Sequence, residues 1–278
     1  MDKTDIKKFQ VTIWSFYKAN KRNFPWRNTT DPYKILVSEI MLQQTQADRV
    51  VAFYERWIKR FPGITSLASA KFSEIYPFWQ GLGYNRRALA LQKLAKEVAS
   101  EHQGKLPVDI VLLQQLPGIG PYTAQAISIF SYNRPLTCLE TNIRRVFIHH
   151  FFPEGDAVTD EEILPLLDLA LPAKRSREWH WALMDYGAHL KSTVPNPNRR
   201  HKNYSIQSKF EGSVRQIRGS ILRNLAGKKM SFSELMKIYP PRNNAESYAE
   251  KRGKLKIILD SMEKEELITH DKKNYSLK

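Results

Sequence analysis

Residues 116–123, which read LPGIGPYT, constrain the fold of this chain more than any other stretch. Gly118 and Gly120 carry no Cβ, so the backbone can turn sharply there, and Pro121 suits the first turn of a predicted helix over 121–132. The free N–H groups at the start of such a helix attract an anion, which predicts a hairpin that holds a phosphate. Taken alone, a turn of this kind is more typical of a plain connection between two helices.

The rest of the chain has a helical pattern, with apolar residues three and four positions apart and Pro or Gly between the blocks. Asp31-Pro32 supplies an N-cap and a first-turn proline for one of the helices. No convincing strand precedes the last dozen residues. The pattern predicts helices over 6–18, 31–47, 47–60, 73–79, 85–100, 108–115, 121–132, 142–151, 160–170 and 177–189.

A linker is predicted at Pro195–His201, because the sequence PNPNRRH is a poor candidate for a packed element. Beyond it, helices are predicted over 213–226, 232–238 and 245–266, followed by a hairpin of 267–269 and 275–277. This order resembles a winged helix-turn-helix domain, whose groove or backbone reader would be the helix with Lys251, Arg252, Lys254 and Lys256. A purely structural helical cap is the alternative.

The charge of the chain favours a polyanionic partner. Lys and Arg number 44 against 28 Asp and Glu, for a formal net charge of +16. Residues 199–278 hold 19 basic and 9 acidic side chains, so +10 of that charge lies in the last 80 positions. This excess indicates a C-terminal region that binds phosphates, with a solvated basic surface as the alternative.

The single cysteine, Cys138, excludes an intramolecular disulfide and any multi-cysteine metal or iron–sulfur site in this chain. It lies in an apolar run, where a small buried hydrophobic side chain is expected. His149, His150, His180 and His189 show no metal-ligand spacing among themselves, so we expect structural roles for them and no metal site. Residues 1–8 are charged and no long apolar segment follows, which predicts a soluble protein that does not enter a membrane.

Six ordered motifs resemble those of the helix-hairpin-helix (HhH-GPD) DNA glycosylases, closest to the adenine glycosylase (MutY) branch. They are PWR, DPYKILVSEIMLQQTQ, GLGY, LPGIGPYTA, LETNIRRV and WALMDYGA, and the match runs from about Ile6 to His201. The resemblance implies an all-α, two-lobed fold over 1–200, with DNA between the lobes and a base flipped into a pocket. One six-helix lobe would cover about 30–135, the second lobe 1–29 and 136–200, and the basic winged-helix-like domain 201–278.

The resemblance also implies the catalytic groups. Glu39 occupies the place of the pocket glutamate that protonates the leaving base, and Glu140 stands where the family has an aspartate that stabilises the sugar cation. Asn142 would orient that carboxylate or the attacking water, and Asp185 is a less favoured substitute for Glu140. Tyr122 takes the place of the lysine found in bifunctional relatives such as endonuclease III. A phenol cannot form a Schiff base, so hydrolysis without strand cleavage (no AP lyase activity) is expected.

DNA contacts are implied at three further motifs. Gln43, Gln44 and Thr45 match positions that probe the gap and the opposite base, and Tyr84 lies in the GLGY motif. Gly118 and Gly120 would hold the DNA backbone, with a monovalent cation as a further family trait of that hairpin. Arg199, Arg200 and Lys202 would keep phosphate contacts near the predicted linker, and Lys251 and Arg252 would add others in the C-terminal domain.

Two departures from the family pattern concern the iron–sulfur cluster and the C-terminal domain. The four cluster cysteines of the family fall here on Lys191, Asn198, His201 and Gln207, so no cluster can form and no other cofactor is expected. The basic C-terminal region does not resemble the Nudix-like domain of adenine glycosylases. Asn85 also replaces the second tyrosine that usually follows GLGY, so the target base stays open.

The sequence therefore predicts a monofunctional base excision repair glycosylase that acts as a cytoplasmic monomer, or near the nucleoid in a prokaryote. Its partner would be double-stranded DNA with a lesion or mismatch. The excised base would be adenine in a mispair, or thymine, uracil or 5-hydroxyuracil. The alternative, suggested by Glu140, is a catalytically inactive binder of damaged or distorted DNA.

Overall fold

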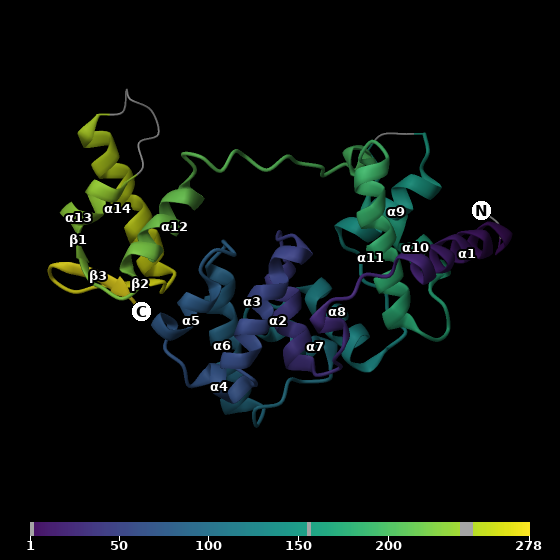
Figure 1. The fold of residues 1–278 in the computed structure, drawn as a ribbon, viewed down its shortest axis with the longest axis horizontal. Coiled ribbons are helices and arrows are strands. Elements are labelled where there is room, and N and C mark those ends of the chain that lie inside the picture. Colours follow the sequence, from purple (N-terminus) through teal and green to yellow (C-terminus); the bar gives the residue numbers. More distant parts are fainter. Residues whose placement is uncertain (1–2, 155–156, 240–246) are drawn as a thin grey trace. The chain divides into compact units, whose positions relative to one another are not determined.

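The computed structural model describes residues 3–154, 157–239 and 247–278 of the chain. They form mostly helices, with a small sheet near the C-terminal end (Figure 1). Contacts divide the chain into two compact units. Unit 1 comprises Met1–Glu39, Pro107–Gln115 and Ile119–Ile206, and unit 2 comprises Ile40–Leu106, Leu116–Gly118 and Gln207–Lys278.

Unit 1 is built around helices α9 and α11, which pack on each other and on α1 and α10. Its core is rich in aromatic rings: Phe9 contacts Phe147 and Trp179 edge-on, with ring centroids 5.3 and 6.0 Å apart. The helices are α1 (Lys3–Asn20), η1 (Pro25–Arg27), α7 (Ile110–Gln115), α8 (Pro121–Tyr132), α9 (Thr141–Phe151), α10 (Asp160–Ala170), α11 (Ser176–Thr193) and η2 (Pro197–Arg200).

Helix α2 (Pro32–Leu42) crosses from unit 1 into unit 2. Asp31 starts it as the sequence predicts, since its Oδ1 accepts a hydrogen bond from the backbone N–H of Tyr33 at 2.9 Å. The helix ends at Leu42, however, five residues before the predicted end at Ala47. Gln43 therefore lies outside α2, although the helix predicted over 31–47 includes it.

The first part of unit 2 consists of α3 (Ala47–Arg60), α4 (Ile64–Ala68), α5 (Phe72–Trp79) and α6 (Arg86–Glu101). Trp57 and Trp79 are fully buried and meet edge-on, with ring centroids 5.4 Å apart. The short helix α4 was not predicted. It packs along α6 with Ile64 and Leu67 buried, so tertiary contacts hold a segment too short to be stable alone.

The C-terminal part of unit 2 has the winged-helix order that the sequence predicts. It contains α12 (Val214–Leu225), β1 (Met230–Ser231), α13 (Phe232–Ile238), α14 (Tyr248–Lys264), β2 (Ile268–His270) and β3 (Asn274–Leu277). The strands form an antiparallel sheet in the order β1-β3-β2, with Met230 opposite Tyr275. The hairpin was predicted and β1 was not, because two residues are too few to show an alternating pattern. Residues 245 and 246, the predicted start of the last helix, lie outside the described residues.

The segment expected to be a linker, Pro195–His201, is instead packed. Pro197 and Asn198 are buried, and the one-turn helix η2 contacts α9. The exposed, irregular stretch comes later, over 202–211. The predicted domain boundary after residue 200 and the predicted lobe ranges stay predictions.

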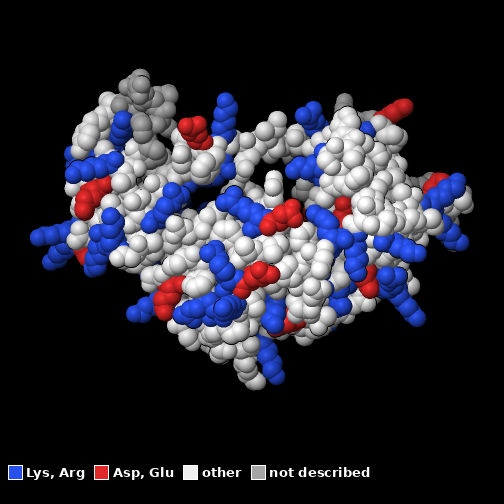
Figure 2. All heavy atoms as spheres, viewed as in Figure 1, with Lys and Arg blue, Asp and Glu red and all other residues white. Residues whose placement is uncertain are grey.

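Basic side chains are spread over the visible surface and outnumber acidic ones, rather than gathering in one patch (Figure 2). Among the described residues, no helix has the length and apolar character needed to cross a bilayer. The described part of the chain also contains no group of three or more His, Cys, Asp or Glu side chains that could hold a metal ion.

Candidate active site

Glu39 and Tyr122 meet in unit 1, although they are 83 positions apart in the chain. Glu39 lies near the end of α2 and is only 6% exposed. Tyr122 lies in the first turn of α8, and its Oη donates a hydrogen bond to Glu39 Oε2 at 2.9 Å. Burial raises the pKa of the Tyr122 phenol well above its usual value, and the charge of Glu39 raises it further. The phenol therefore stays protonated and acts as the donor.

The carboxyl of Glu39 can hold a proton near neutral pH. Burial raises the pKa of Glu39 to about 7, and the negative charge of Glu140 also raises it. The hydrogen bond from Tyr122 and the positive charge of Arg27 lower it, but do not offset the burial. At pH 7 the protonated and ionised forms of Glu39 are thus both well populated, as a general acid requires.

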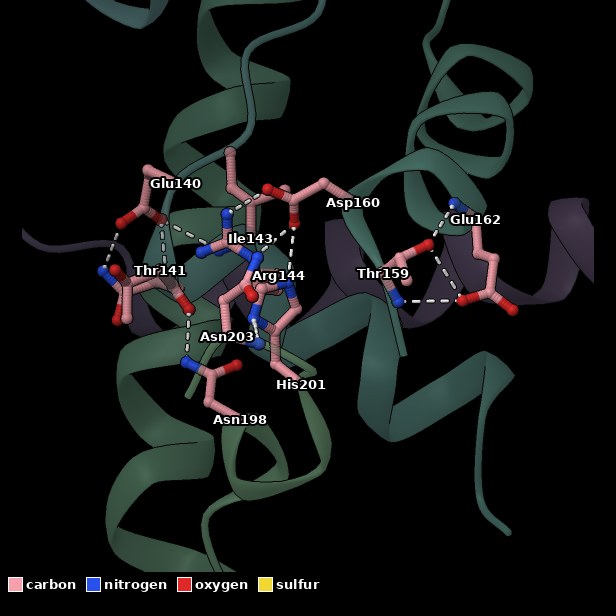
Figure 3. Close-up of polar contacts among 11 residues, drawn as sticks. Glu140, Thr141, Ile143, Arg144, Thr159, Asp160, Glu162, Asn198, His201 and Asn203 are labelled. Carbon is pink, nitrogen blue, oxygen red and sulfur yellow. Dashed lines mark hydrogen bonds and ion pairs between the residues drawn. The ribbon is translucent and has the colours of Figure 1, made fainter. Parts of the chain in front are cut away.

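Glu140 caps the N-terminus of α9. Its Oε1 accepts hydrogen bonds from the backbone N–H groups of Asn142 and Ile143, each at 2.8 Å, and its Oε2 accepts one from Asn142 Nδ2 at 3.0 Å (Figure 3). Burial raises the pKa of Glu140 above its usual value, and these hydrogen bonds and Arg145 offset only part of that rise. Asp is a favoured N-cap residue and Glu is not, but Glu140 caps α9 through the backbone N–H groups of Asn142 and Ile143.

Asn142 is fixed by contacts that sequence reasoning missed. Its Oδ1 accepts a hydrogen bond from Arg145 Nη1 at 2.7 Å, and the same nitrogen donates to the carbonyl oxygen of Gly187 at 2.7 Å. A Cβ at Gly187 would lie 2.2 Å from the backbone oxygen of Asn142, so only glycine lets α11 come this close to α9. Arg145 lies in the motif LETNIRRV and Gly187 in the motif WALMDYGA, so motif membership was the sequence signal that could have identified them.

Cys138 is fully buried, as predicted. Burial raises the pKa of its thiol well above the usual value, and the charges of Glu39 and Glu140 raise it further, so the thiol stays neutral. Its backbone N–H donates to His180 Nε2 at 3.3 Å, and His180 Nδ1 lies 2.7 Å from the carbonyl oxygen of Ser176. Burial lowers the pKa of His180 to about 4, which agrees with the predicted structural role of this neutral ring.

Asp185, the less favoured catalytic candidate, is buried on α11 and paired with two arginines. Its Oδ1 accepts from Arg22 Nε at 2.6 Å and from Arg27 Nη2 at 2.8 Å. Its Oδ2 accepts from the backbone N–H of Arg22 at 3.0 Å and from Arg27 Nη1 at 2.8 Å. A carboxylate with four donors around it has no acceptor position left for catalysis, which favours a structural role.

The three residues expected to probe DNA, Gln43, Gln44 and Thr45, form the turn after α2 in unit 2. Arg87, which sequence reasoning missed, holds this turn. Its guanidinium donates to five backbone carbonyls, those of Ile40, Met41, Gln43, Leu82 and Gly83. This half-buried side chain thus joins the end of α2 to the loop before α6, where Tyr84 is 37% exposed with φ at 46°.

The two hairpin glycines differ in conformation. Gly118 has φ at +81°, which favours glycine, and a Cβ there would lie 2.9 Å from the Cβ of Ala90. Gly120, the N-cap of α8, has an ordinary extended conformation, with φ at −93°, and open space around it. The expected sharp turn therefore depends on Gly118 alone. Asn133 ends α8 in the left-handed conformation typical of a C-cap.

The other predicted DNA-contact residues vary in their exposure. Arg199, Lys202 and Arg252 are exposed, and Lys251 is half-buried. Arg200 is engaged within the protein, since its Nη1 donates to the carbonyl oxygen of Pro153 and its Nη2 to that of Ile148. The Arg200 guanidinium therefore stabilises the end of α9, and these bonds use donors that the prediction assigns to a phosphate.

The residues at the family's cluster positions do not fit a four-cysteine iron–sulfur cluster, because Lys191, Asn198, His201 and Gln207 supply no thiolate. Polar contacts hold this region instead (Figure 3). Asn198 Nδ2 donates to the carbonyl oxygen of Thr141 at 2.9 Å, and His201 Nε2 lies 3.1 Å from Asp160 Oδ1. Asp160 also accepts two hydrogen bonds from Arg144, and its pKa is lowered chiefly by them.

Comparisons with known proteins point to one family. The sequence profile of the HhH-GPD superfamily of base excision DNA repair proteins matches residues 37–169. The chain is 33% identical over 233 residues to an adenine DNA glycosylase of Mycobacterium tuberculosis, covering 76% of each chain. It is also 33% identical over 210 residues to an adenine DNA glycosylase of Mus musculus, covering 71% of this chain and 40% of the relative.

Solved structures agree. A thermostable thymine-DNA glycosylase is similar at 27% identity with a TM-score of 0.60, covering 66% of this chain and 87% of that one. Endonuclease III in a non-covalent DNA complex shares the fold at 18% identity with a TM-score of 0.57, covering 70% of this chain and 90% of that one.

Proposed function

The chain belongs to the HhH-GPD superfamily of base excision DNA repair proteins, and we propose that it is a monofunctional glycosylase for a damaged or mismatched base. It would hydrolyse the bond between that base and its deoxyribose and leave the DNA strand uncut. The observation that carries this proposal is the buried Glu39, whose pKa is raised to about 7 by burial and which Tyr122 holds by a hydrogen bond. The predicted partner is double-stranded DNA, and we propose that the protein acts as a monomer without a cofactor.

Glu39 would supply the proton that makes the base a better leaving group. Because Oε2 accepts the hydrogen bond of Tyr122, the proton of the neutral acid belongs on Oε1. The phenol thus selects which oxygen donates, and it holds the side chain in one orientation. A base whose ring nitrogen or oxygen reaches Oε1 would take the proton as its bond to the sugar breaks.

Glu140 would stabilise the positive charge that develops on the sugar. A helix N-terminus favours the ionised form of a carboxylate, and three hydrogen bonds keep the oxygens of Glu140 in place before the reaction. Asn142 orients Oε2 through its amide, and Arg145 orients Asn142 in turn. This arrangement supports Glu140 as the working carboxylate despite its extra methylene group.

Tyr122 supports the monofunctional assignment. A lyase reaction through a Schiff base needs an amine next to the sugar, and the side chain that donates a hydrogen bond to Glu39 is the phenol of Tyr122. Water is then the nucleophile that completes the reaction. The proposal therefore excludes strand scission by the protein itself.

Adenine in a mispair is the first candidate for the target, because the relatives are named adenine DNA glycosylases. Thymine, uracil and 5-hydroxyuracil remain in the proposal, and the name of one similar structure, a thymine-DNA glycosylase, supports a pyrimidine. A general acid with a pKa of about 7 serves either kind of base.

A panel of end-labelled duplexes tests the proposal. It contains adenine opposite 8-oxoguanine or guanine, and thymine, uracil or 5-hydroxyuracil opposite guanine. We expect one or more of these strands to be cut only after alkali treatment. Scission without alkali would contradict the monofunctional assignment, and tight binding with no excision of any base would favour the inactive binder.

A further inference from the structure

Two of the residues expected to contact DNA already make hydrogen bonds to a later stretch of the same unit. Gln207 Nε2 donates to Gln44 Oε1 at 3.3 Å, and it also donates to the phenol oxygen of Tyr84. Arg215, near the start of α12, donates to the same phenol oxygen from Nη1 at 3.2 Å. Side chains of the C-terminal stretch therefore use the polar groups of Gln44 and Tyr84 that are expected to face DNA.

The segment before α12 is held by polar contacts rather than by burial. Residues 202–211 are exposed and irregular, and even the apolar side chains of Ile206 and Phe210 are 81% and 62% exposed. Arg215 Nη2 donates to the carbonyl oxygen of Ser208 at 2.7 Å, which ties this segment to α12. A segment with so little apolar burial can leave its position at a small cost in free energy.

Two adjacent carboxylates connect the winged-helix part to α6. Glu265, the residue that ends α14, pairs with Arg86 Nε at 3.0 Å, and both of its oxygens accept hydrogen bonds from Arg218 of α12. Glu266 pairs with Lys93 Nζ at 2.9 Å. Because Arg86 and Lys93 both lie on α6, these ion pairs hold the winged-helix part beside the loop that carries Tyr84.

These ion pairs are of a kind that separates readily. The side chains of Arg86 and Lys93 are 73% and 46% exposed, and exposed ion pairs contribute little to stability. A cavity of about 460 Å³ also lies between residues 84–87 and α12. Well-packed protein interiors leave few voids larger than a water molecule, so apolar packing does little to hold the two sides of this cavity together.

We propose that the C-terminal winged-helix part makes an autoinhibitory contact: it engages Gln44 and Tyr84 in the free protein, and duplex DNA displaces it. This rests on the proposed function, since it takes Gln44 and Tyr84 to be DNA contacts. Phosphate and carboxylate oxygens are alternative acceptors for a guanidinium, so DNA competes with Glu265 for Arg86. The apparent affinity for DNA is then reduced in proportion to the fraction of protein that is open.

Gln207→Ala tests the contact through the sign of its effect. Losing a DNA contact would weaken binding, whereas losing an inhibitory contact should strengthen it. By fluorescence anisotropy, the variant should bind a duplex with a tetrahydrofuran abasic site about fivefold more tightly, the gain expected when the closed form loses one hydrogen bond. Ser205→Ala is the matched control, because Ser205 is exposed in the same segment and its side chain makes none of the hydrogen bonds found among the described residues. Unchanged or weaker binding by Gln207→Ala would overturn the proposal.

Glu265→Gln tests the ion pairs at the other end of the contact. Stopped-flow association with the same duplex should be about two- to fivefold faster than for Glu263→Gln, the gain expected for an exposed ion pair. Both variants lose one negative charge, but Glu263 is exposed and belongs to none of the ion pairs found in the described part of the chain. Equal association rates for the two variants would contradict the proposal.

Spin labels measure the displacement directly and need no excision. Lys96→Cys on α6 and Lys256→Cys on α14 place the labels at exposed positions, and the native Cys138 is buried and stays unlabelled. Pulsed electron paramagnetic resonance should give a narrow distance distribution for the free protein and a longer or broader one with the abasic duplex. Gln207→Ala should broaden the distribution without DNA, so a protein that excised no base could still pass this test. The same distribution in all three samples would overturn the proposal.

Discussion

At the scale of single residues, the behaviour of Glu39 depends on a balance between burial and hydrogen bonding. Burial destabilises the ionised carboxylate and raises its pKa, whereas the phenol of Tyr122 stabilises the ionised form and lowers it. The result lies near neutral pH, where a carboxyl can both hold and release a proton. Tyr122 therefore tunes the acid in addition to orienting it.

Tyr122→Phe should shift the pH dependence of base excision. Removing the phenol removes a hydrogen bond that lowers the pKa of Glu39, so that pKa should rise above about 7. Protonated Glu39 would then persist to higher pH, and the fall in rate on the alkaline side should move upward. Single-turnover rates across pH measure this shift. Tyr132→Phe, on the same helix but 39% exposed, should leave the profile unchanged; an unshifted profile for Tyr122→Phe would refute the tuning role.

The sequence motifs indicated which residues to consider, and the structure brings Glu39, Tyr122, Glu140 and Asn142 into one unit. The interactions among these four residues could not be predicted from the sequence. The Tyr122–Glu39 bond joins helices 83 positions apart, and no local pattern encodes such a contact. Their catalytic roles stay predictions until variants are measured.

At the scale of helices and turns, the approach of α11 to α9 depends on Gly187. Its carbonyl oxygen accepts a hydrogen bond from Arg145, which also holds Asn142 beside Glu140. A helix interior normally disfavours glycine, so its presence here is explained by the space that a Cβ would need.

Gly187→Ala should lower the free energy of unfolding by about 1–3 kcal/mol, because a Cβ would overlap the backbone of Asn142 and force the helices apart. Excision should fall as well, since Asn142 and Glu140 would move. Chemical denaturation measures the first effect. Gly219→Ala is the control: this helical position has open space around it, so the change should stabilise by about 0.5–1 kcal/mol. Equal stability of both variants would contradict the packing argument.

The end of α2 shows why some element boundaries could not be predicted. Carbonyl groups at a helix C-terminus need partners, and Arg87 supplies them from 44 to 47 positions away. Local signals place a helix start at Asp31 correctly, because the capping side chain lies beside the helix that it caps. They do not reveal an end that is held by a distant arginine.

Arg87→Met should therefore destabilise unit 2 by about 2–4 kcal/mol, since buried carbonyl groups would lose their donor. Thermal unfolding measures this loss, with Arg86→Met as the control because the side chain of Arg86 is 73% exposed. DNA affinity should also fall, as the Gln43–Thr45 turn loses its support. If Arg87→Met and Arg86→Met unfolded at the same temperature, the hydrogen bonds from Arg87 to the carbonyl groups would contribute little to stability.

At the scale of the whole molecule, the helical class, the winged-helix order and the family were all accessible from motif order and helical periodicity. The packing of the segment predicted as a linker was not accessible, because Pro197 and Asn198 are typical loop residues and are buried by contacts with distant parts of the chain such as α9. The same contacts now occupy the region where the family has its cluster cysteines. We therefore propose that hydrogen bonds and the Asp160 ion pairs replace the cluster as its support.

Elemental analysis tests that replacement. The purified protein should contain no stoichiometric iron, and an iron chelator should leave both its melting temperature and its activity unchanged. Asp160→Asn, which weakens the pairs with Arg144 and His201, should lower the melting temperature instead. Iron bound in proportion to protein, and lost together with stability, would contradict this view.

The pH dependence of single-turnover excision, compared between wild type and Glu39→Gln, tests the central assignment most directly. The wild-type rate should fall as pH rises through about 7, because Glu39 loses its proton there, and on the acid side as Glu140 is protonated. Glu39→Gln should lower the rate by about 10²–10⁴-fold, keep DNA affinity and abolish the alkaline limb. A Glu39→Gln variant with the wild-type rate and the wild-type profile would show that this carboxyl is not the acid.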